Sequence, residues 1–138
     1  MKVSDVMSKQ VDFVASDTSV RDVCRIIFGR GINGVPVCKG KKVVGFITEH
    51  DILFKFYPSM QEYMEDTVHM GDFEGMEEKA SEIFALTAEK IMSKNPTTVD
   101  QDTPLLRANS LMSTRKVGRL PVVDEKGNLV GILSKGDV

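Results

Sequence analysis

The sequence has few of the residues that metal or disulfide chemistry requires. It contains two cysteines, Cys24 and Cys38, and two histidines, His50 and His69, and none is spaced as metal ligands usually are. Two cysteines in 138 residues fit a reduced, cytoplasmic chain better than a disulfide framework. We therefore expect a cytoplasmic protein with no metal site and no required cofactor.

Long apolar runs and a strong net charge are also absent. No run approaches the ~20 apolar residues of a transmembrane helix. An acid comes early at Asp5 and no apolar stretch follows, unlike a signal peptide. The net charge of −2 argues against a nucleic-acid backbone as partner, because such binding needs a basic face. We expect neither nucleic acid nor membrane as a partner.

An internal repeat is the most informative feature of the chain. Motifs of the first half recur 85 residues later, so that Val6 corresponds to Ile91. After one extra residue in a turn of the second half, the offset becomes 86 residues. The matched motifs are Val6-Met7-Ser8 with Ile91-Met92-Ser93, Gly34-Val35-Pro36-Val37 with Arg119-Leu120-Pro121-Val122, and Val44-Gly45-Phe46-Ile47-Thr48 with Val130-Gly131-Ile132-Leu133-Ser134. This period is too long for a solenoid. It predicts two copies of a small unit with a site between them.

Each copy is predicted as strand, helix, strand, strand, helix. Strands are expected at 11–14, 35–38 and 43–48, and then at 97–99, 120–123 and 129–134. The helices are expected to begin at caps in 17–19, at 48–51 and at Thr103, with Pro104 in the first helical position. One unit of ~50 residues buries too little surface to be stable alone. We therefore expect an α+β fold in which the two pseudo-symmetric units pack sheet to sheet.

The segment between the copies is acidic. Residues 58–90 carry nine acids and two lysines, a local balance of −7, so the rest of the chain totals +5. A mildly basic body suits an anionic small ligand, although a solvated linker beside an ordinary surface explains the charges equally well. The expected organisation is a first motif at 1–57, an acidic insert and linker helix at 58–87, and a second motif at 88–138. The linker helix is predicted from Ser81 to Met92.

In both copies the last predicted strand ends at a Thr or Ser, and an Asp follows three residues later. The motif is Thr48-Glu49-His50-Asp51 in the first copy and Ser134-Lys135-Gly136-Asp137 in the second. A hydroxyl followed three residues later by an acid is typical of a helix cap. A short carboxylate at a helix start can also accept hydrogen bonds from two sugar hydroxyls, and free amides nearby favour an anion. Both roles are compatible.

These motifs, in order and twice, resemble a tandem pair of cystathionine-β-synthase-type domains, the CBS pair or Bateman module. The resemblance covers nearly everything outside residues 58–81. It implies a regulatory sensor that binds AMP, ADP, ATP or S-adenosylmethionine in clefts between the copies, forms a homodimer and regulates a partner protein. It also implies that the last helix continues beyond Val138.

The resemblance assigns ribose contacts to Asp51 with Thr48, and to Asp137 with Ser134. The ligand-binding residues implied opposite them are Val117, Gly118 and Arg119 for Asp51, and Ile32, Asn33, Gly34 and Val35 for Asp137. Arg119 is the implied phosphate contact, and Gly34 at its repeat position makes the second cleft the weaker one. His50 could also reach a phosphate, although a solvated histidine at a helix start accounts for it equally well.

Two other functions are also compatible with a chain of this composition. The first is a ligand-free dimerisation or scaffold module. The second is a small enzyme, which the sequence disfavours because no Ser-His-acid or Cys-His arrangement is supported by neighbouring motifs. We expect no catalytic residues. Arg115 and Lys116, which precede the Arg119 segment, add positive field or are ordinary surface charges.

Overall fold

The structure is a computed structural model that describes residues 1–56 and 73–135. The first half contains α1 (Val3–Val6), β1 (Val14–Ala15), α2 (Val20–Arg30), β2 (Gly34–Lys39), β3 (Lys42–Thr48) and a helix at 49–56. The second contains α4 (Phe73–Ala85), α5 (Ala88–Ile91), β4 (Ser93–Lys94), β5 (Val99–Asp100), α6 (Leu105–Arg115), β6 (Arg119–Val123) and β7 (Leu129–Ser134). Residues 57–72, which include the first half of the acidic insert with His69, and residues 136–138, which include Asp137, lie outside the described residues.

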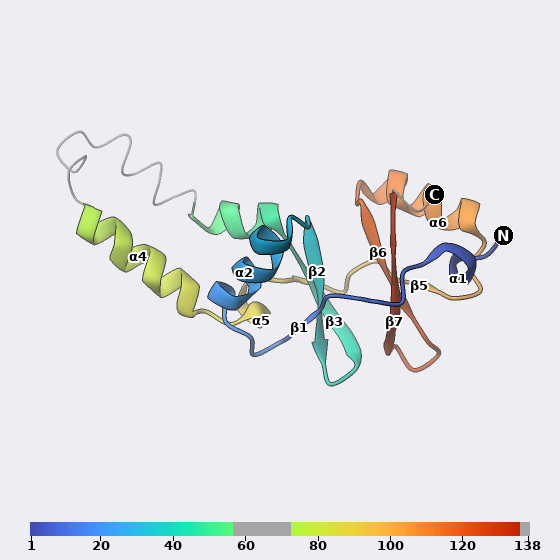
Figure 1. Ribbon diagram of the computed structural model, residues 1–138, viewed down its shortest axis with the longest axis horizontal. Coiled ribbons are helices and arrows are strands. Elements are labelled where there is room, and N and C mark those ends of the chain that lie inside the picture. The colour runs from blue at the N-terminus through green and yellow to red at the C-terminus, as the bar shows by residue number, and fades with distance from the viewer. Residues whose placement is uncertain (57–72, 136–138) are drawn as a thin grey trace.

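Two small sheets face each other at the centre of the molecule. Their strand orders are β1-β2-β3-β4 and β5-β6-β7. Helices cover the outer side of each sheet, with α2 and α5 on one side and α6 and α1 on the other (Figure 1). The predicted α+β fold with two pseudo-symmetric motifs packed sheet to sheet is therefore confirmed. Among the described residues, no helix is long and apolar enough to cross a membrane.

Each sheet is built on one antiparallel hairpin. In β2-β3 the hairpin turns at Gly40, and in β6-β7 it turns at Gly127; both glycines have positive φ, 62° and 83°. The pairing places Gly34 opposite Thr48 and, at the matching position, Arg119 opposite Ser134. The hydroxyl of each repeat motif therefore lies directly across the hairpin from the residue that opens the preceding strand.

A separate apolar core lies behind each sheet. In the first half, Val23 and Ile27 of α2 pack against β2 and β3, including Val35, Val37 and Ile47. In the second half, Ala108 and Met112 of α6 pack against Leu120, Val122 and Leu133. The helical spacing of these side chains gives each helix a single buried face toward its sheet.

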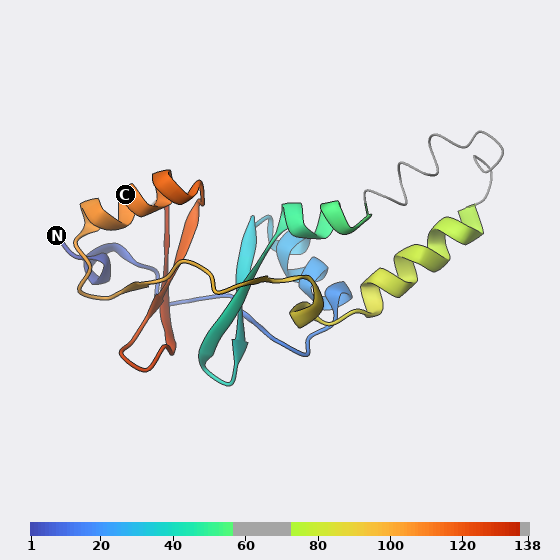
Figure 2. The same cartoon turned by 180° about the vertical axis from the view of Figure 1, so that it is seen from behind.

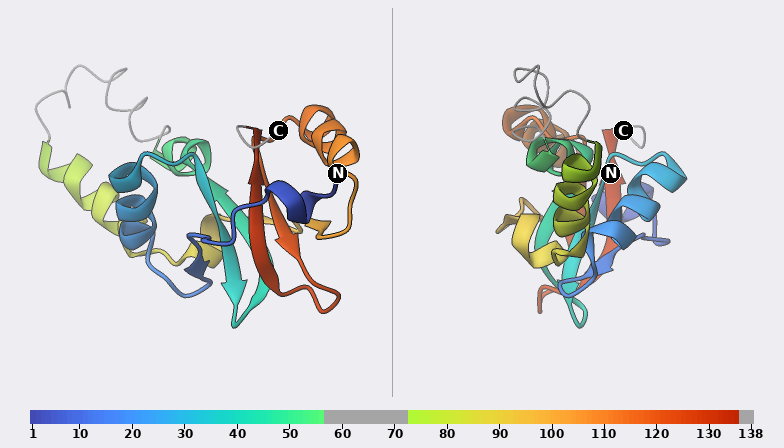
Figure 3. Two further views of the ribbon diagram at one scale, coloured as in Figure 1. Left: turned by 45° about the vertical axis from the view of Figure 1, so that its right-hand side comes forward. Right: turned by 90° about the vertical axis from the view of Figure 1, so that its left-hand side faces the viewer.

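The short helix at the start of each motif packs against the core of the other motif: α1 packs against the second core, and α5 packs against the first. Val3 of α1 is fully buried in the second core, and Ala88 of α5 is fully buried in the first. The amides of these two residues make matching bonds, from Val3 N to Thr103 O at 3.0 Å and from Ala88 N to Thr18 O at 2.7 Å. Figure 3 shows α1 beside the second half, and Figure 2 shows the chain after α5 crossing from one sheet to the other. The exchange ties the halves together.

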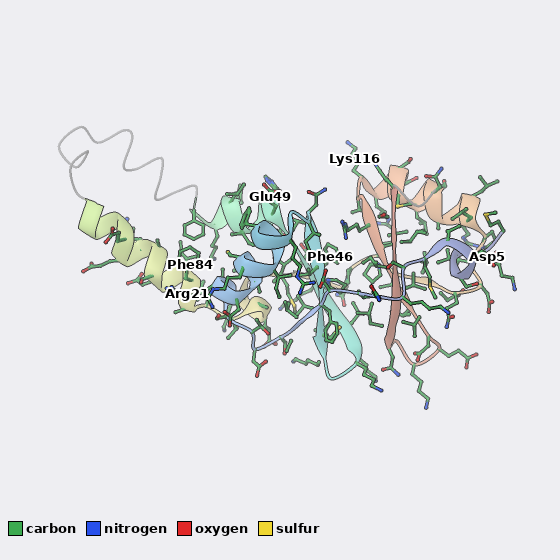
Figure 4. All side chains as sticks on the ribbon, in the orientation of Figure 1. Asp5, Arg21, Phe46, Glu49, Phe84 and Lys116 are labelled. Carbon is green, nitrogen blue, oxygen red and sulfur yellow. The ribbon has the colours of Figure 1, made fainter. Side chains whose placement is uncertain are left out.

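Helix α4 adds a contact that has no counterpart among the described residues of the second half. Phe84 lies near the end of α4, and the guanidinium of Arg21 on α2 lies over its ring, 5.4 Å from the ring centroid (Figure 4). The centroids of the Phe84 and Phe56 rings are 5.2 Å apart. The position that matches Arg21 on α6 is Leu106, which is 81% exposed.

Three predicted boundaries were wrong. Thr103 does not cap α6: its hydroxyl donates to Asp100 Oδ1 at 3.1 Å, and Pro104 is the N-cap residue. The single helix expected from Ser81 to Met92 is broken between α4 and α5, because Leu86 O accepts from Val20 N at 2.7 Å. The first strands begin at Val14 and Val99, so each overlaps its predicted range only at its last residue.

Candidate ligand-binding clefts

The Thr48 motif forms a reciprocal helix cap. Thr48 N donates to Asp51 Oδ2 at 2.9 Å, and Asp51 N donates to Thr48 Oγ1 at 3.1 Å. Glu49 N, between them, donates to Asn33 O at 2.8 Å and fixes the helix start beside the opening of β2. Both groups are partly buried, so the cap orients the Asp51 carboxylate at the edge of the first sheet. No bond of its Oδ1 atom to a described residue is seen.

A cleft of about 510 Å³ lies between the two sheets. Its volume is within the range of ~300–1,000 Å³ that is typical of small-molecule sites. From the first copy it is lined by Asn33, Gly34, Phe46 and Thr48; from the second it is lined by Ser93, Pro96, Thr97, Lys116, Val117, Gly118, Arg119, Pro121, Ser134 and Lys135. We call this the larger cleft. It brings Thr48 to the same cavity as the segment Val117 to Arg119.

A second hollow of about 160 Å³ is related to the larger cleft by the repeat. It is lined by Ser8, Gln10, Val11, Asp12, Ile32, Gly34, Pro36, Arg119, Ile132 and Ser134. Ser8 matches Ser93, Asp12 matches Thr97, and Ile132 matches Phe46, so the same positions of each copy form both cavities. We call this the smaller cleft. Arg119, Gly34 and Ser134 line both clefts and lie between them.

The structure does not bring all the expected residues to a cleft. Asp51 lines neither cleft, and His50 is exposed with its ring 6.0 Å from that of Phe54. The side chain of Val35 is fully buried in the first core, where a ligand cannot reach it. Asp137 lies outside the described residues.

A wider hollow of about 1040 Å³ on the outer side of the second motif is a poor site for an anion. Its lining includes the four carboxylates of Asp100, Asp102, Asp124 and Glu125. A backbone hydrogen bond from Asn128 lowers the pKa of Asp124, which keeps that carboxylate ionised. Arg107 and Lys126 offset two of these charges, but the lining keeps a net charge of −2 (two cations against four carboxylates), which disfavours phosphate. The candidate site therefore stays between the sheets.

The CBS domain family model matches residues 3–57 and 88–138. The chain belongs to the CBS domain family. The two matched segments correspond to the repeats, and the larger and smaller clefts lie between the two CBS motifs. The resemblance inferred from the motifs is thereby confirmed.

Relatives of known sequence are mostly longer than this chain. It is 29% identical over 130 residues to an inosine-5'-monophosphate dehydrogenase of Korarchaeum cryptofilum, matching 94% of this chain and 22% of that enzyme. It is 30% identical over 150 residues to an uncharacterized protein of Methanocaldococcus jannaschii, covering 100% of this chain and 89% of that protein. A second uncharacterized protein of the same organism is 31% identical over 138 residues, and this chain spans 43% of its length.

Solved CBS pairs share the fold along the whole chain. CBSX2 of Arabidopsis thaliana, crystallised with AMP, has a TM-score of 0.76 and 27% identity over 99% of this chain and 91% of that chain. The CBS domain pair of MJ0100, crystallised with 5'-methylthioadenosine and S-adenosyl-L-methionine, has a TM-score of 0.70 and 25% identity, with 99% and 91% covered.

Sequence reasoning missed several residues of the larger cleft in this CBS pair. Phe46, Pro96 and Thr97 line it but were not proposed as ligand contacts. Lys116 was proposed only as a flanking charge, and Lys135 only as an alternative source of the basic contact. The repeat carried a signal only for the positions at which the two copies differ in charge. Thr97 and Lys135 occupy the positions of Asp12 and Glu49, so the two copies differ in charge at two positions that line the larger cleft in the second copy.

Proposed function

We propose that this CBS pair is a regulatory module that binds an adenosine-containing ligand in the larger cleft. One observation carries the proposal: the hydroxyl motifs and strand openings of both copies meet in a cavity of nucleotide size. CBS pairs of the same fold have been crystallised with AMP and with S-adenosyl-L-methionine, which supports this ligand class.

Within this proposal the ligand lies between two kinds of contact. The apolar faces of Phe46, Pro96 and Pro121 are suited to the adenine ring, while Thr48 and Ser134 offer hydroxyls. The backbone at Asn33 and Gly118 offers amides close to the cavity. Asp51 and Asp137 are the proposed ribose partners, and Asp51 is hydrogen-bonded to Thr48, which lines the larger cleft.

We further propose that the module acts by changing shape and not by catalysis. A ligand held between the two sheets contacts both halves, so it favours the angle between them at which it binds best. The matching enzyme from Korarchaeum cryptofilum is much longer than this chain, which is consistent with a module that serves an attached or separate partner protein.

A homodimer is the proposed assembly. Large apolar side chains are exposed on the outer helices: Phe28 on α2, Leu53 and Phe54 on the helix at 49–56, and Leu106 on α6. Association of two copies through these helices would bury them. Light scattering at micromolar concentration should give the mass of a dimer, and replacing Leu53 and Phe54 by serine should give a monomer. A monomeric wild-type protein would refute this assembly.

Calorimetric titration with adenosine, AMP, ATP and S-adenosylmethionine tests the ligand class. We expect at least one of these compounds to bind with micromolar affinity and to raise the melting temperature. Mass spectrometry of ligand released from the purified protein provides an independent identification. If no adenosine compound binds and none is released, the scaffold function becomes the better explanation.

A further inference from the structure

The repeat relates the two copies, and at four matched positions the second copy is more positive than the first. In the second copy these positions hold Thr97, Lys116, Arg119 and Lys135, all of which line the larger cleft. In the first copy they hold Asp12, Gly31, Gly34 and Glu49. The second copy therefore offers three cations where the first offers two carboxylates and no cation.

The linings of the two cavities reflect this difference. Among its described residues, the larger cleft has three cations and no carboxylate. The described lining of the smaller cleft has one carboxylate, Asp12, and one cation, Arg119, and Asp12 is paired with Arg30 at 2.6 Å. Within residues 1–56 and 73–135, Lys116, Arg119 and Lys135 form no ion pair. Three like charges around one cavity repel each other, and an anion placed between them relieves that repulsion.

The backbone at Lys116 supports a role in binding. Lys116 ends α6 in the left-handed conformation, with φ of 55°, and Gly31 ends α2 at the matching position with φ of 65°. Glycine adopts this conformation without strain, whereas a lysine adopts it at a cost in stability. Figure 4 shows Lys116 at the end of α6 that is nearer the first half. The fold alone would favour glycine here, so the lysine side chain is better explained by what it does in the cleft.

We propose, on the basis of the adenosine-ligand function above, that the larger cleft selects ligands that carry a phosphate chain. Lys116, Arg119 and Lys135 are its phosphate contacts, and Thr97 replaces a carboxylate that would repel the chain. Affinity at this cleft rises with the number of phosphates, in the order adenosine, AMP, ADP, ATP. The smaller cleft, whose described charges cancel, does not share this preference.

The decisive variant is Lys116→Gly, because its expected effects on folding and on binding have opposite signs. The melting temperature should stay the same or rise, since glycine relieves the left-handed backbone. The ratio of ATP affinity to adenosine affinity should fall about five- to ten-fold, because a charge-assisted contact is lost. Titration calorimetry with ATP and adenosine measures this ratio in both proteins.

Arg115→Ala is the matched control, because Arg115 is exposed on α6, next to Lys116, and does not line the larger cleft. It removes the same charge from the protein and should leave the affinity ratio unchanged. Lys135→Gln is a second test, since Lys135 is exposed and makes no ion pair with a described residue. It should lower the ratio as Lys116→Gly does.

The outcomes separate this inference from the proposed function. If no adenosine compound binds to the wild-type protein, the proposed function fails and this inference fails with it. If adenosine binds but ATP binds no more tightly, or if Lys116→Gly and Arg115→Ala lower the ratio equally, only the phosphate preference is wrong. A ratio that falls in Lys116→Gly and Lys135→Gln alone supports the inference.

Discussion

Thr48 and Asp51 each satisfy the backbone amide of the other at the start of the helix at 49–56. The same carboxylate is the proposed ribose partner, so its removal should have two separable effects. Asp51→Ala should lower the free energy of unfolding by about 1 kcal/mol through loss of the cap. It should also weaken binding of the adenosine ligand by roughly 30- to 100-fold, because two charge-assisted hydrogen bonds are lost.

Ser19→Ala provides the control for this prediction. Ser19 Oγ caps α2 by accepting from Asp22 N at 3.2 Å, and Ser19 lines neither cleft. Chemical denaturation should show a similar loss of stability in both variants, whereas calorimetry should show weaker binding only in Asp51→Ala. Equal affinities in two folded variants would remove Asp51 from the site.

The hairpins and the packing of the sheets were predictable because their signals are local and occur twice. Gly40 and Gly127 indicate the turns, and the apolar residues on either side indicate the strands. The exchange of α1 and α5 was not predictable, since Val3 and Ala88 find their partners in the other half of the chain. Strand β4 was missed for the same reason: its pairing with Gly45 and Phe46 leaves no local pattern in Ser93 and Lys94.

The cleft was predicted in outline and not in detail. The motifs identified Thr48, Ser134 and the segment Val117 to Arg119, all of which line the larger cleft. Phe46 and Pro96 carry no such signal, because an apolar residue at a strand or loop position is ordinarily core. Their place in the cavity follows from how the two sheets meet, which depends on contacts distant in sequence.

Two glycines allow the lead-in segments to cross the sheets closely. A Cβ atom at Gly45 would overlap the sulfur of Met92, and one at Gly131 would lie 2.7 Å from the sulfur of Met7. Gly45→Ala should therefore lower the free energy of unfolding by about 1–3 kcal/mol through overpacking. Gly29→Ala in α2, where nothing lies within 4 Å, should raise it by about 0.5–1 kcal/mol. Urea unfolding of both variants measures the difference, and a destabilised Gly29→Ala would contradict the packing argument.

The two cysteines should react slowly in the folded protein. Burial raises the pKa of both Cys24 and Cys38 above the ordinary value of 9.0, so the nucleophilic thiolate is scarce near pH 8. Labelling with a thiol reagent should be much faster in denaturant than in the folded protein. As the pH is raised, the labelling rate of the folded protein should go on rising after the rate of the unfolded chain has levelled off. Cys38→Ser should retain most of the native labelling, because Cys38 is buried and Cys24 is half-buried. Rapid labelling of native Cys38 would show that the first core opens readily.

The exchanged segment at the N-terminus makes the second core dependent on the first residues of the chain. Val3 is fully buried among Val99, Leu120 and Leu133 of the second motif, although in sequence it belongs to the first motif. Val3→Ala should lower the free energy of unfolding by about 2 kcal/mol. The substitution should make local opening of the second sheet more frequent. Amide hydrogen exchange should therefore accelerate more at β6 and β7 than at β2 and β3. Thr114→Ala is the control, since Thr114 is exposed on α6 and lines neither cleft, so its loss should change neither quantity by much. Faster exchange confined to the first sheet would mean that α1 does not stabilise the second core in solution.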